Sequence, residues 1–263
     1  MRRAPAAVAA LAGALALALS SCSGSVSGQS PQGEHHTSGQ SEQSLTVFAA
    51  ASLAEPMDDL LDIFAEQHPD VTVQPGVYDG SSTLVTQLTE GADADVLATA
   101  NTDTMDDLVS AFDERDLQPT LFATNTLVIA VPQGNPKNIE DLDDLHQARF
   151  VVCASQVPCG AAAQELFEAS GFDGEAISQE QNVTAAARRV VSGAADAALV
   201  YATDVASRQD ELDAVVPAKA GQVVNQYPIL TLNQNSPAAE EFTDLVLSDQ
   251  GQEILSGYGF GAP

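Results

Sequence analysis

The sequence predicts an α/β protein whose folded part has two lobes. Strand-like apolar runs alternate with segments whose apolar residues recur at helical spacing, which is typical of βαβ units and a mostly parallel sheet. The alternation restarts in the second half of the chain. The part that carries it, residues 45–263, is long enough to bury a sizeable core in each of two lobes.

The first half of this part alternates short strands with amphipathic helices. Apolar runs mark the strands, and apolar residues at helical spacing mark the helices, most clearly over residues 57–64. His68-Pro69 ends the first helix and Gly91 ends the second. In chain order the predicted elements are strand 45–48, a helix ending at residue 68, strand 71–73, helix 81–90, strand 95–98 and a helix over 105–112.

The second half repeats the pattern without repeating the sequence. The predicted elements are strands 127–131, 150–152 and 197–201, helices 161–169 and 185–191, a return strand 227–232, and helices 238–247 and 252–255. The chain is expected to cross between the lobes near residues 122–126 and again near 226–232. Lobe 1 then holds residues 45–124 and 232–263, and lobe 2 holds residues 125–231.

The N-terminal residues have the pattern of an export signal. Arg2-Arg3 precedes an apolar stretch over residues 6–19 that is too short to span a membrane, and Cys22 follows small residues. This pattern resembles a bacterial lipoprotein signal, which implies a signal peptide over residues 1–21, cleavage before Cys22 and lipid on the Cys22 thiol. An ordinary secretory signal followed by an unrelated cysteine is the alternative.

Residues 22–44 are predicted to be a flexible tether. They are rich in Ser, Gly, Gln, His and Pro and have almost no apolar residues to bury. His35-His36 lies within this segment and is interpreted as a solvated pair in preference to a metal site. The expected location is extracytoplasmic, with the lipid as the only contact to the cell membrane.

The charge balance is strongly acidic. The chain has 37 Asp and Glu against 9 Lys and Arg, for a formal net charge of −28. Such a chain repels nucleic acids and anionic membrane surfaces, so neither is an expected partner. The acidic residues are spread through the helical segments, which predicts a solvated acidic surface, and a salty habitat is one origin consistent with it.

Four predicted helix beginnings share one chemistry. Ligands of open α/β sheets bind beyond the carboxyl ends of strands, where helices begin. All four offer backbone N–H groups and the positive end of a helix dipole, which suit an anion. Two add hydroxyl groups, and none places Lys or Arg at its tip. They begin at Ser52, at Asp79-Gly80-Ser81-Ser82-Thr83, at Val157-Pro158-Cys159-Gly160 and at Gln181-Asn182-Val183-Thr184.

Helix capping is the competing interpretation of the serines. Ser52 with Glu55 fits a capping box, and Ser81 or Ser82 fits a cap of its own helix. The stretch "FAAAS" at residues 48–52 still favours a ligand site. Its three alanines leave space for close approach to the backbone, and the serine adds a donor.

Six short motifs occur in a fixed order along the mature chain: "TVFAAASL" at 46–53, "GSSTL" at 80–84, "ADVLATA" at 94–100, "VPCG" at 157–160, "LVYATD" at 199–204 and "GYGF" at 257–260. Together they resemble the molybdate-binding proteins of ABC importers. The pairing of "FAAASL" with the spaced "SST" is the most specific part. The resemblance implies a two-lobed, type II periplasmic-binding-protein-like fold with a ligand cleft between the lobes, and high-affinity binding of molybdate or tungstate without catalysis.

The resemblance also implies which residues hold the oxyanion. Ser52 and Ser81 match hydroxyl and backbone donors of the first lobe. Cys159 and Val183 match backbone amides of the second lobe, and Tyr201 matches a hydroxyl donor. The set contains no cofactor and no ligand to a metal cation, since molybdate binds as an oxyanion. The implied partners are an ABC permease and its ATPase, with the binding protein as a monomer.

Two positions depart from the family pattern. Cys159 stands where the family often has alanine. Asp79-Gly80 shortens the serine run, which leaves the choice between Ser81 and Ser82 open by one position.

A shell of fixed N–H and O–H donors selects ligands by their protonation state. Phosphate carries a proton at neutral pH and needs an acceptor, whereas molybdate, tungstate and sulfate do not. Rejection of sulfate must therefore rely on the size of the cavity. A binding protein for another tetrahedral oxyanion, such as sulfate, is the alternative function.

Cys153 and Cys159 are predicted to form a disulfide, because they lie close together in an exported chain. A pair of free thiols is the alternative. A loop this short contributes about 2 kcal/mol by the chain-entropy model. Its larger effect would be to stiffen the turn that presents the Cys159 amide.

An exported hydrolase is the rival class, and it would need a nucleophile with a base in reach. Neither His68 nor His146 stands beside Ser52 or Ser81 in the sequence, and no G-x-S-x-G motif occurs. A binding protein for ferric iron is a further rival, but the tyrosines are scattered instead of adjacent.

Two residues near the end of strand 197–201 have more than one interpretation. Tyr201 is either a ligand donor or a core residue whose hydroxyl reaches the surface. Asp204 is expected to cap a helix, because its carboxylate would repel a dianion.

Overall fold

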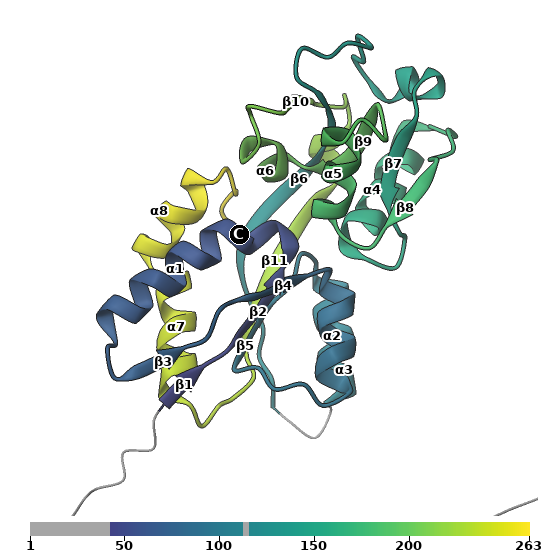
Figure 1. Ribbon diagram of the computed structural model, residues 1–263. Helices are drawn as coiled ribbons and strands as arrows, with labels where there is room; N and C mark the ends of the chain where they lie inside the picture. The colour runs from purple at the N-terminus through teal and green to yellow at the C-terminus, as the bar shows by residue number, and fades with distance from the viewer. Residues whose placement is uncertain (1–42, 113–115) are drawn as a thin grey trace, which may run out of the picture. The chain divides into compact units, whose positions relative to one another are not determined.

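Residues 43–112 and 116–263 are the part of the chain that the computed structural model describes, and they form an α/β domain on a mixed sheet (Figure 1). The strand order is β4-β2-β5-β11-β6-β9-β7-β8, and β10 pairs with β6 beside this path. The strands are β1 (Gln43–Leu45), β2 (Val47–Ala50), β3 (Val71–Val73), β4 (Val77–Asp79), β5 (Val96–Ala98), β6 (Thr120–Pro132), β7 (Phe150–Cys153), β8 (Ser178–Glu180), β9 (Ala197–Tyr201), β10 (Leu212–Val215) and β11 (Val224–Thr231).

Helices flank the sheet, and short 3-10 helices (η) join some of the elements. In chain order they are η1 (Ala51–Leu53), α1 (Ala54–Gln67), α2 (Ser81–Thr89), α3 (Thr102–Ala111), η2 (Leu142–Gln147), α4 (Pro158–Ser170), α5 (Val183–Val191), α6 (Ala202–Ala206), η3 (Ala220–Gln222), α7 (Pro237–Leu247) and α8 (Asp249–Gly257). Within the described residues, no helix has the length and apolar character needed to cross a membrane.

The two lobes differ in which strands they contain. The first lobe is built on β4, β2 and β5, which pair in parallel, and the second lobe is built on β9, β7 and β8, which also pair in parallel. Antiparallel pairing is confined to β11, β6 and β10 and their neighbours. The predicted βαβ units therefore account for the parallel strands, and the sheet as a whole is mixed.

Two long strands connect the lobes. In β6, residues 120–126 pair with β11, and residues 127–130 pair with β9 in the second lobe. The end of β11 pairs with β5 in the first lobe. The predicted crossings therefore fall on these two strands. Contacts are dense enough throughout that this part of the chain forms one compact unit, so the exact limits of the lobes remain a prediction.

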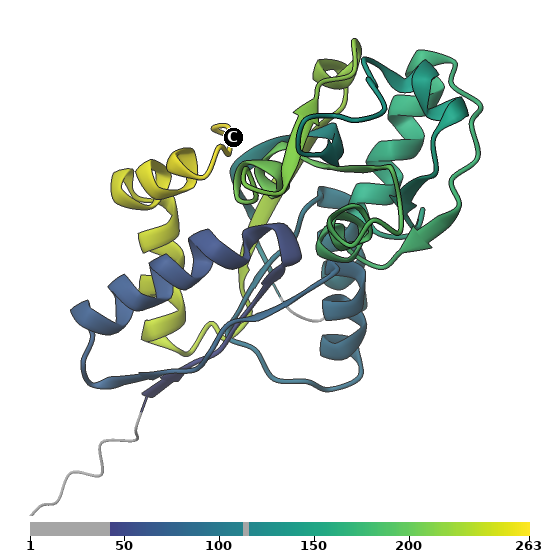
Figure 2. The ribbon, with the colours of Figure 1, turned by 45° about the horizontal axis from the view of Figure 1, so that its top comes forward.

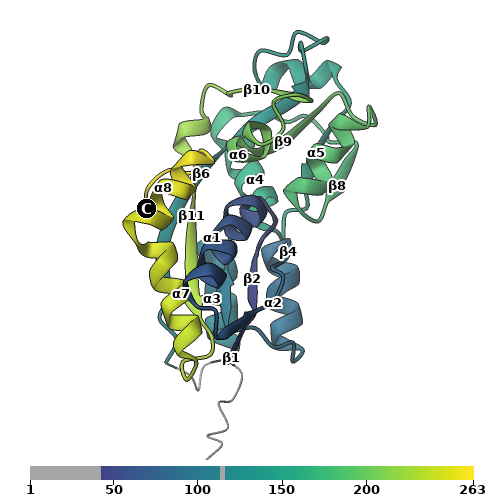
Figure 3. The ribbon, with the colours of Figure 1, turned by 60° about the vertical axis from the view of Figure 1, so that its left-hand side comes forward.

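Alternation along β2 shows how both faces of the first lobe are covered. Val47 and Ala49 belong to the core beneath α1 and α7, while Phe48 between them belongs to a second core with α2 and α3. Helices α1, α7 and α8 contact one another on one side of the sheet (Figures 1 and 2), and α2 and α3 form the other layer (Figure 3). On the first side, Phe64 meets Phe242 edge to face at 5.6 Å between ring centroids.

The predicted signal peptide, Cys22 and nearly all of the tether lie outside the described residues. The last two residues of the predicted tether, Gln43 and Ser44, belong to β1, which pairs in parallel with β3. The folded domain therefore begins slightly earlier than the sequence predicted. Backbone pairing with β3 explains this, because it does not depend on the apolar side chains that mark a strand in the sequence.

Candidate functional site

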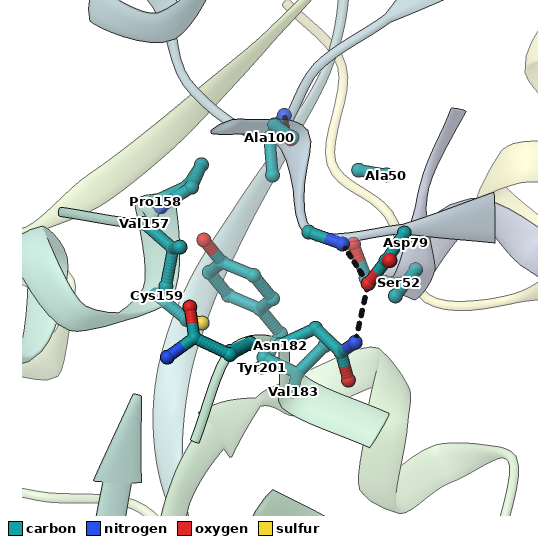
Figure 4. A pocket seen from close by; sticks show the side chains of 14 residues that line it. Ala50, Ser52, Asp79, Ala100, Val157, Pro158, Cys159, Asn182, Val183 and Tyr201 are labelled. Carbon is teal, nitrogen blue, oxygen red and sulfur yellow. Dashed lines mark hydrogen bonds between the residues drawn. The ribbon is translucent and has the colours of Figure 1, made fainter. Parts of the chain in front are cut away.

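A small cavity lies where four helix beginnings from the two lobes meet (Figure 4). All five predicted ligand residues line it: Ser52, Ser81, Cys159, Val183 and Tyr201. The cavity measures about 20 Å³, against roughly 10–15 Å³ for a site that holds one water molecule. A cavity of this volume suits a compact ion better than sugars, peptides or larger metabolites.

The local structure explains why these residues converge. Ser52 lies in η1 directly after β2, and Ser81 is the first residue of α2 directly after β4. Cys159 and Val183 lie in the first turns of α4 and α5. Backbone N–H groups in a first turn have no partner within the helix. Together with the helix dipoles, they make the cavity attractive to a negative charge.

The alanines of "FAAAS" have separate roles. Ala49 is fully buried in the core of the first lobe, while Ala50 and Ala51 line the cavity. Ala100, after the neighbouring strand β5, lines it as well. Each of these alanines adds no more than a methyl group to the wall of the cavity.

Neither predicted ligand serine caps a helix. Gly80 occupies the cap position of α2 and Ala50 that of η1, and neither position has a side-chain cap. Instead, Ser81 Oγ accepts a hydrogen bond from the backbone N–H of Ala100, at 3.1 Å. The capping interpretation is therefore wrong for Ser52 and Ser81. The bond leaves the Ser81 hydroxyl proton free to point into the cavity.

The two neighbouring serines differ in their positions relative to the cavity, which favours Ser81 as the predicted contact. Ser81 is buried and lines the cavity. Ser82 faces away from it and donates its hydroxyl to the carbonyl of Gln156 in the other lobe, at 2.7 Å.

Tyr201 ends β9 and is buried, with its ring between the start of α4 and Ala100 (Figure 4). Its Oη accepts a hydrogen bond from Asn225 Nδ2 at 2.9 Å. Burial raises the pKa of Tyr201 well above its usual value, so the hydroxyl keeps its proton at physiological pH. Tyr201 is therefore a core residue that lines the cavity, its hydroxyl does not reach the outer surface, and its role as a ligand donor stays a prediction.

Ser52 is held by a second buried tyrosine. Ser52 Oγ and Tyr227 Oη lie 3.1 Å apart, and either can be the donor. Burial raises the pKa of Tyr227 as well, so this hydroxyl is also protonated. When Tyr227 donates to Ser52, the Ser52 proton is available to a ligand.

The charges around the cavity are unusual for an anion site. None of the 14 residues that line it is Lys, Arg or His, and one, Asp79, is acidic. Asp79 Oδ1 accepts hydrogen bonds from the backbone N–H of Gly80 and from Asn182 Nδ2, both at 2.7 Å (Figure 4). These two donors offset part of the negative charge that Asp79 would present to an anion.

The lobes touch one another beside the cavity. Asp79 and Asn182 join them through the bond just described, and Ser82 and Gln156 form another. A Cβ atom added to Gly80 would lie only 2.4 Å from the carbonyl oxygen of Gln181. The lobes are thus closed against each other at this point.

The predicted disulfide between Cys153 and Cys159 is confirmed, with an S–S distance of 2.10 Å. It ties the end of β7 to the first turn of α4, where Cys159 lines the cavity. The enclosed turn is tight, because a Cβ atom on Gly160 would lie 1.8 Å from the carbonyl oxygen of Ala154. Glycine is required there by this close approach.

Asp204 lies outside the cavity lining, as predicted. Its Oδ2 accepts a hydrogen bond from the backbone N–H of Tyr201, the residue before α6, at 3.0 Å. Burial raises the pKa of Asp204 to about 7.

The histidines that a hydrolase would need lie elsewhere. His68 stacks on Phe64 at the end of α1, and His146 lies 3.6 Å from Asp173 in the second lobe. Over residues 43–112 and 116–263, no group of three or more His, Cys, Asp or Glu residues is arranged to hold a metal ion.

A two-lobed α/β domain with a small cavity between its lobes is typical of solute-binding proteins. The family model for bacterial extracellular solute-binding proteins matches residues 45–261, and the chain belongs to this family. Its fold is that of the type II periplasmic binding proteins, in agreement with the sequence prediction. The family is one of solute-binding proteins.

Relatives share much of the sequence over most of their length. The molybdate-binding protein ModA of Mycobacterium tuberculosis is 40% identical over 228 residues, which cover 85% of this chain and 87% of the relative. The molybdate-binding protein ModA of Escherichia coli is 30% identical over 234 residues, covering 83% of this chain and 89% of the relative. The resemblance to molybdate-binding proteins inferred from the motifs is thus confirmed.

Solved structures share the fold at low identity. The periplasmic molybdate-binding protein of Azotobacter vinelandii has a TM-score of 0.68 at 19% identity and covers 83% of this chain and 99% of its own. The sulfate-binding protein SubI of Mycobacterium tuberculosis has a TM-score of 0.68 at 19% identity and covers 83% of this chain and 86% of its own. This likeness concerns the fold alone, since one of these proteins binds molybdate and the other sulfate.

Proposed function

We propose that this protein binds molybdate, and tungstate with it, outside the cytoplasm and delivers the anion to an ABC transporter. The observation that carries the proposal is the cavity itself, which is small, lies at four helix beginnings and has no Lys, Arg or His in its lining. The similarity to molybdate-binding proteins over most of the chain supports the choice of anion.

The proposed ligand shell consists of donors from both lobes. Ser52 and Ser81 contribute hydroxyl and backbone donors, and Cys159 and Val183 contribute first-turn amides. Tyr201 completes the shell with its hydroxyl. Each charge-assisted bond is worth about 1.5–3 kcal/mol, so five such residues can replace the water that a dianion loses on binding.

Sulfate is the alternative ligand, and size must decide between the two. Molybdate is larger than sulfate because molybdenum–oxygen bonds are longer than sulfur–oxygen bonds. Both are fully deprotonated at neutral pH and suit a shell of donors. Hydrogen phosphate presents its own O–H to a shell made mainly of donors. The carboxylate in the lining, Asp79, already accepts two hydrogen bonds through Oδ1.

Calorimetry with molybdate, tungstate, sulfate and phosphate tests the proposal. We expect molybdate and tungstate to bind far more tightly than sulfate, and phosphate to bind least. Saturating molybdate should also raise the melting temperature, because the ligand binds the folded state. Tight binding of sulfate or phosphate without a response to molybdate would overturn the proposal.

The proposed organisation of the chain follows from the same function. Lobe 1 comprises residues 45–124 and 232–263 and lobe 2 residues 125–231, with the anion between them. Lipid on Cys22 anchors the protein to the membrane after removal of residues 1–21, and the tether lets the monomeric domain reach the permease. Cys22→Ala should move the protein from the membrane fraction to the soluble fraction, and retention on the membrane would argue against lipid at this residue.

A further inference from the structure

A buried asparagine behind the cavity contacts two parts of its wall. Asn225 lies on β11, is 7% exposed and is not itself part of the cavity lining. Its Nδ2 donates to the carbonyl oxygen of Ala100 and to Tyr201 Oη, each at 2.9 Å. The two protons of the amide group therefore serve two different acceptors.

Ala100 fixes which way this amide faces. A backbone carbonyl can only accept, so it requires the NH₂ side of Asn225 and would repel Oδ1. The opposite orientation would place two acceptors against each other in a buried site. Because the same NH₂ group reaches Tyr201, the Tyr201 hydroxyl is held as the acceptor of that bond.

The other end of the amide has no partner. Asn225 Oδ1 is the buried side-chain atom without a hydrogen bond among the described residues. Leaving such an atom unpaired is unfavourable. Asn225 thus donates hydrogen bonds to two residues of the cavity wall, while its own Oδ1 has no hydrogen-bond partner. This combination points to a role beyond packing.

We infer that Asn225 is a positioning residue that directs the Tyr201 proton into the cavity and thereby makes the site selective for fully deprotonated oxyanions. A tyrosine hydroxyl has one proton, and the bond from Asn225 occupies its acceptor side. The neighbouring Tyr227 hydroxyl is the other group that can take this proton. An anion in the cavity competes better than Tyr227, since hydrogen bonds to charged acceptors are stronger.

The backbone of Ala100 acts in the same way on one hydroxyl from each lobe, Ser81 and Tyr201. Its N–H group donates to Ser81, and its carbonyl group orients Asn225, which donates to Tyr201. Both hydroxyls therefore accept from within the protein and have their protons left for a ligand. A ligand that carries its own O–H therefore meets two groups whose protons point toward it, which is unfavourable for that O–H.

This inference rests on the proposed function, and a double-mutant cycle tests it separately. The variants are Tyr201→Phe, Asn225→Ala and the two combined, each titrated with molybdate and phosphate by calorimetry. We expect Tyr201→Phe to weaken molybdate binding by roughly tenfold or more and Asn225→Ala by roughly three- to tenfold. In the Tyr201→Phe background, Asn225→Ala should change the affinity less than about twofold.

Asn125 provides the matched control. It pairs directly with Asn225 across the two strands, is equally buried, and donates to Thr203 Oγ1 at 2.8 Å instead of to Tyr201. Asn125 is also a hydrogen-bond partner of Tyr227, so Asn125→Ala controls for the loss of a buried amide beside the tyrosines, and only Asn225→Ala removes the bond to Tyr201 itself. Melting temperatures of the ligand-free variants report whether each one folds.

The preference for molybdate over phosphate is the second readout. The ratio of molybdate affinity to phosphate affinity should decrease in Asn225→Ala, because the Tyr201 hydroxyl can then turn its lone pair toward the cavity. Effects of Asn225→Ala and Tyr201→Phe that simply add, with the preference unchanged, would overturn the inference. If the wild type binds sulfate and ignores molybdate, the proposed function fails, and the same cycle measured with sulfate still tests Asn225.

Discussion

Asp79 in the first lobe accepts a hydrogen bond from Asn182 in the second, with 2.7 Å between Oδ1 and Nδ2, and this bond lies at the edge of the cavity. Asn182 also caps α5 by accepting from the backbone N–H of Ala185 at 2.8 Å. The side chain that connects the lobes is therefore held by the same helix that presents the Val183 amide. Closure of the lobes and orientation of a ligand donor are coupled through Asn182.

Two substitutions at Asp79 separate this bond from the negative charge. Asp79→Asn keeps an oxygen that can accept from Asn182, and removes a charge that repels an anion. Asp79→Ala removes both. We expect Asp79→Asn to bind molybdate at least as tightly as the wild type, and Asp79→Ala to bind roughly three- to thirtyfold more weakly, in line with the loss of a hydrogen bond.

Titration calorimetry measures this pair of variants. Asp107→Ala, at an exposed position on α3, controls for the change in net charge. If Asp79→Ala bound more tightly than Asp79→Asn, repulsion of the anion would outweigh the bond between the lobes.

Gly80→Ala is expected to obstruct closure without disturbing either lobe. The added methyl group would lie 2.4 Å from the Gln181 carbonyl oxygen in the other lobe, so it collides only when the lobes are closed. We predict at least a tenfold loss of molybdate affinity, with a nearly unchanged melting temperature of the ligand-free protein. Gly221→Ala, where an added methyl group meets no other atoms within 4 Å, is the control.

The sequence predicted the elements that depend on side-chain pattern. Strand 197–201 matches β9 at both ends, and helix 185–191 and strand 150–152 fall within α5 and β7. Strands β4, β8 and β10 were not predicted. They are short and only partly buried, and backbone pairing to neighbours defines them more than any alternation of apolar residues.

The same limit explains which site residues the sequence revealed. Serines at helix beginnings and the tyrosine after an apolar run carry local signals, and these residues do meet at the cavity. The role of Asn225 carries no local signal, because it depends on Ala100 and Tyr201, which are distant in sequence. Contact across the sheet brings these residues together, and no pattern along the chain encodes it.

Cys153→Ala removes the disulfide while keeping the Cys159 backbone amide. The closed loop is short, so the loss of stability should be about 2 kcal/mol, which corresponds to a decrease in melting temperature of roughly 4–8 °C for a domain of this size. Molybdate affinity should fall as well, because the turn before α4 becomes less rigid. A chemical denaturation curve and a calorimetric titration measure the two effects, and a lower melting temperature with unchanged affinity would limit the disulfide to stability.

Asp204→Asn should change how stability depends on pH. Burial raises the pKa of Asp204 from 3.8 to about 7, so the folded chain holds a proton that the unfolded chain releases within this window. The contribution of Asp204 to the unfolding free energy is therefore fully present below about pH 4 and is lost as the pH rises to about 7, by at most about 1.4 kcal/mol per pH unit. The asparagine variant should match the wild type at low pH and exceed it at pH 8.

Urea denaturation at several pH values checks this prediction. Asp107→Asn serves as the control for charge at an exposed position. Parallel curves for Asp204→Asn and the wild type across the whole range would contradict the prediction, because they would show that the pKa of Asp204 is the same in the folded and unfolded states.

Ser52→Ala and Ala51→Leu test whether the turn after β2 holds the anion. Ser52→Ala removes one donor to the ligand and its contact with Tyr227, so molybdate affinity should fall by roughly ten- to a hundredfold. The ligand-free protein should lose only about 1 kcal/mol of stability, the usual value of one hydrogen bond. Ala51→Leu should weaken binding further, because its side chain fills part of a cavity of about 20 Å³.

Each variant needs both a dissociation constant for molybdate and a melting temperature without ligand. Lower melting temperatures with an unchanged dissociation constant would assign these residues to folding and exclude them from the ligand shell.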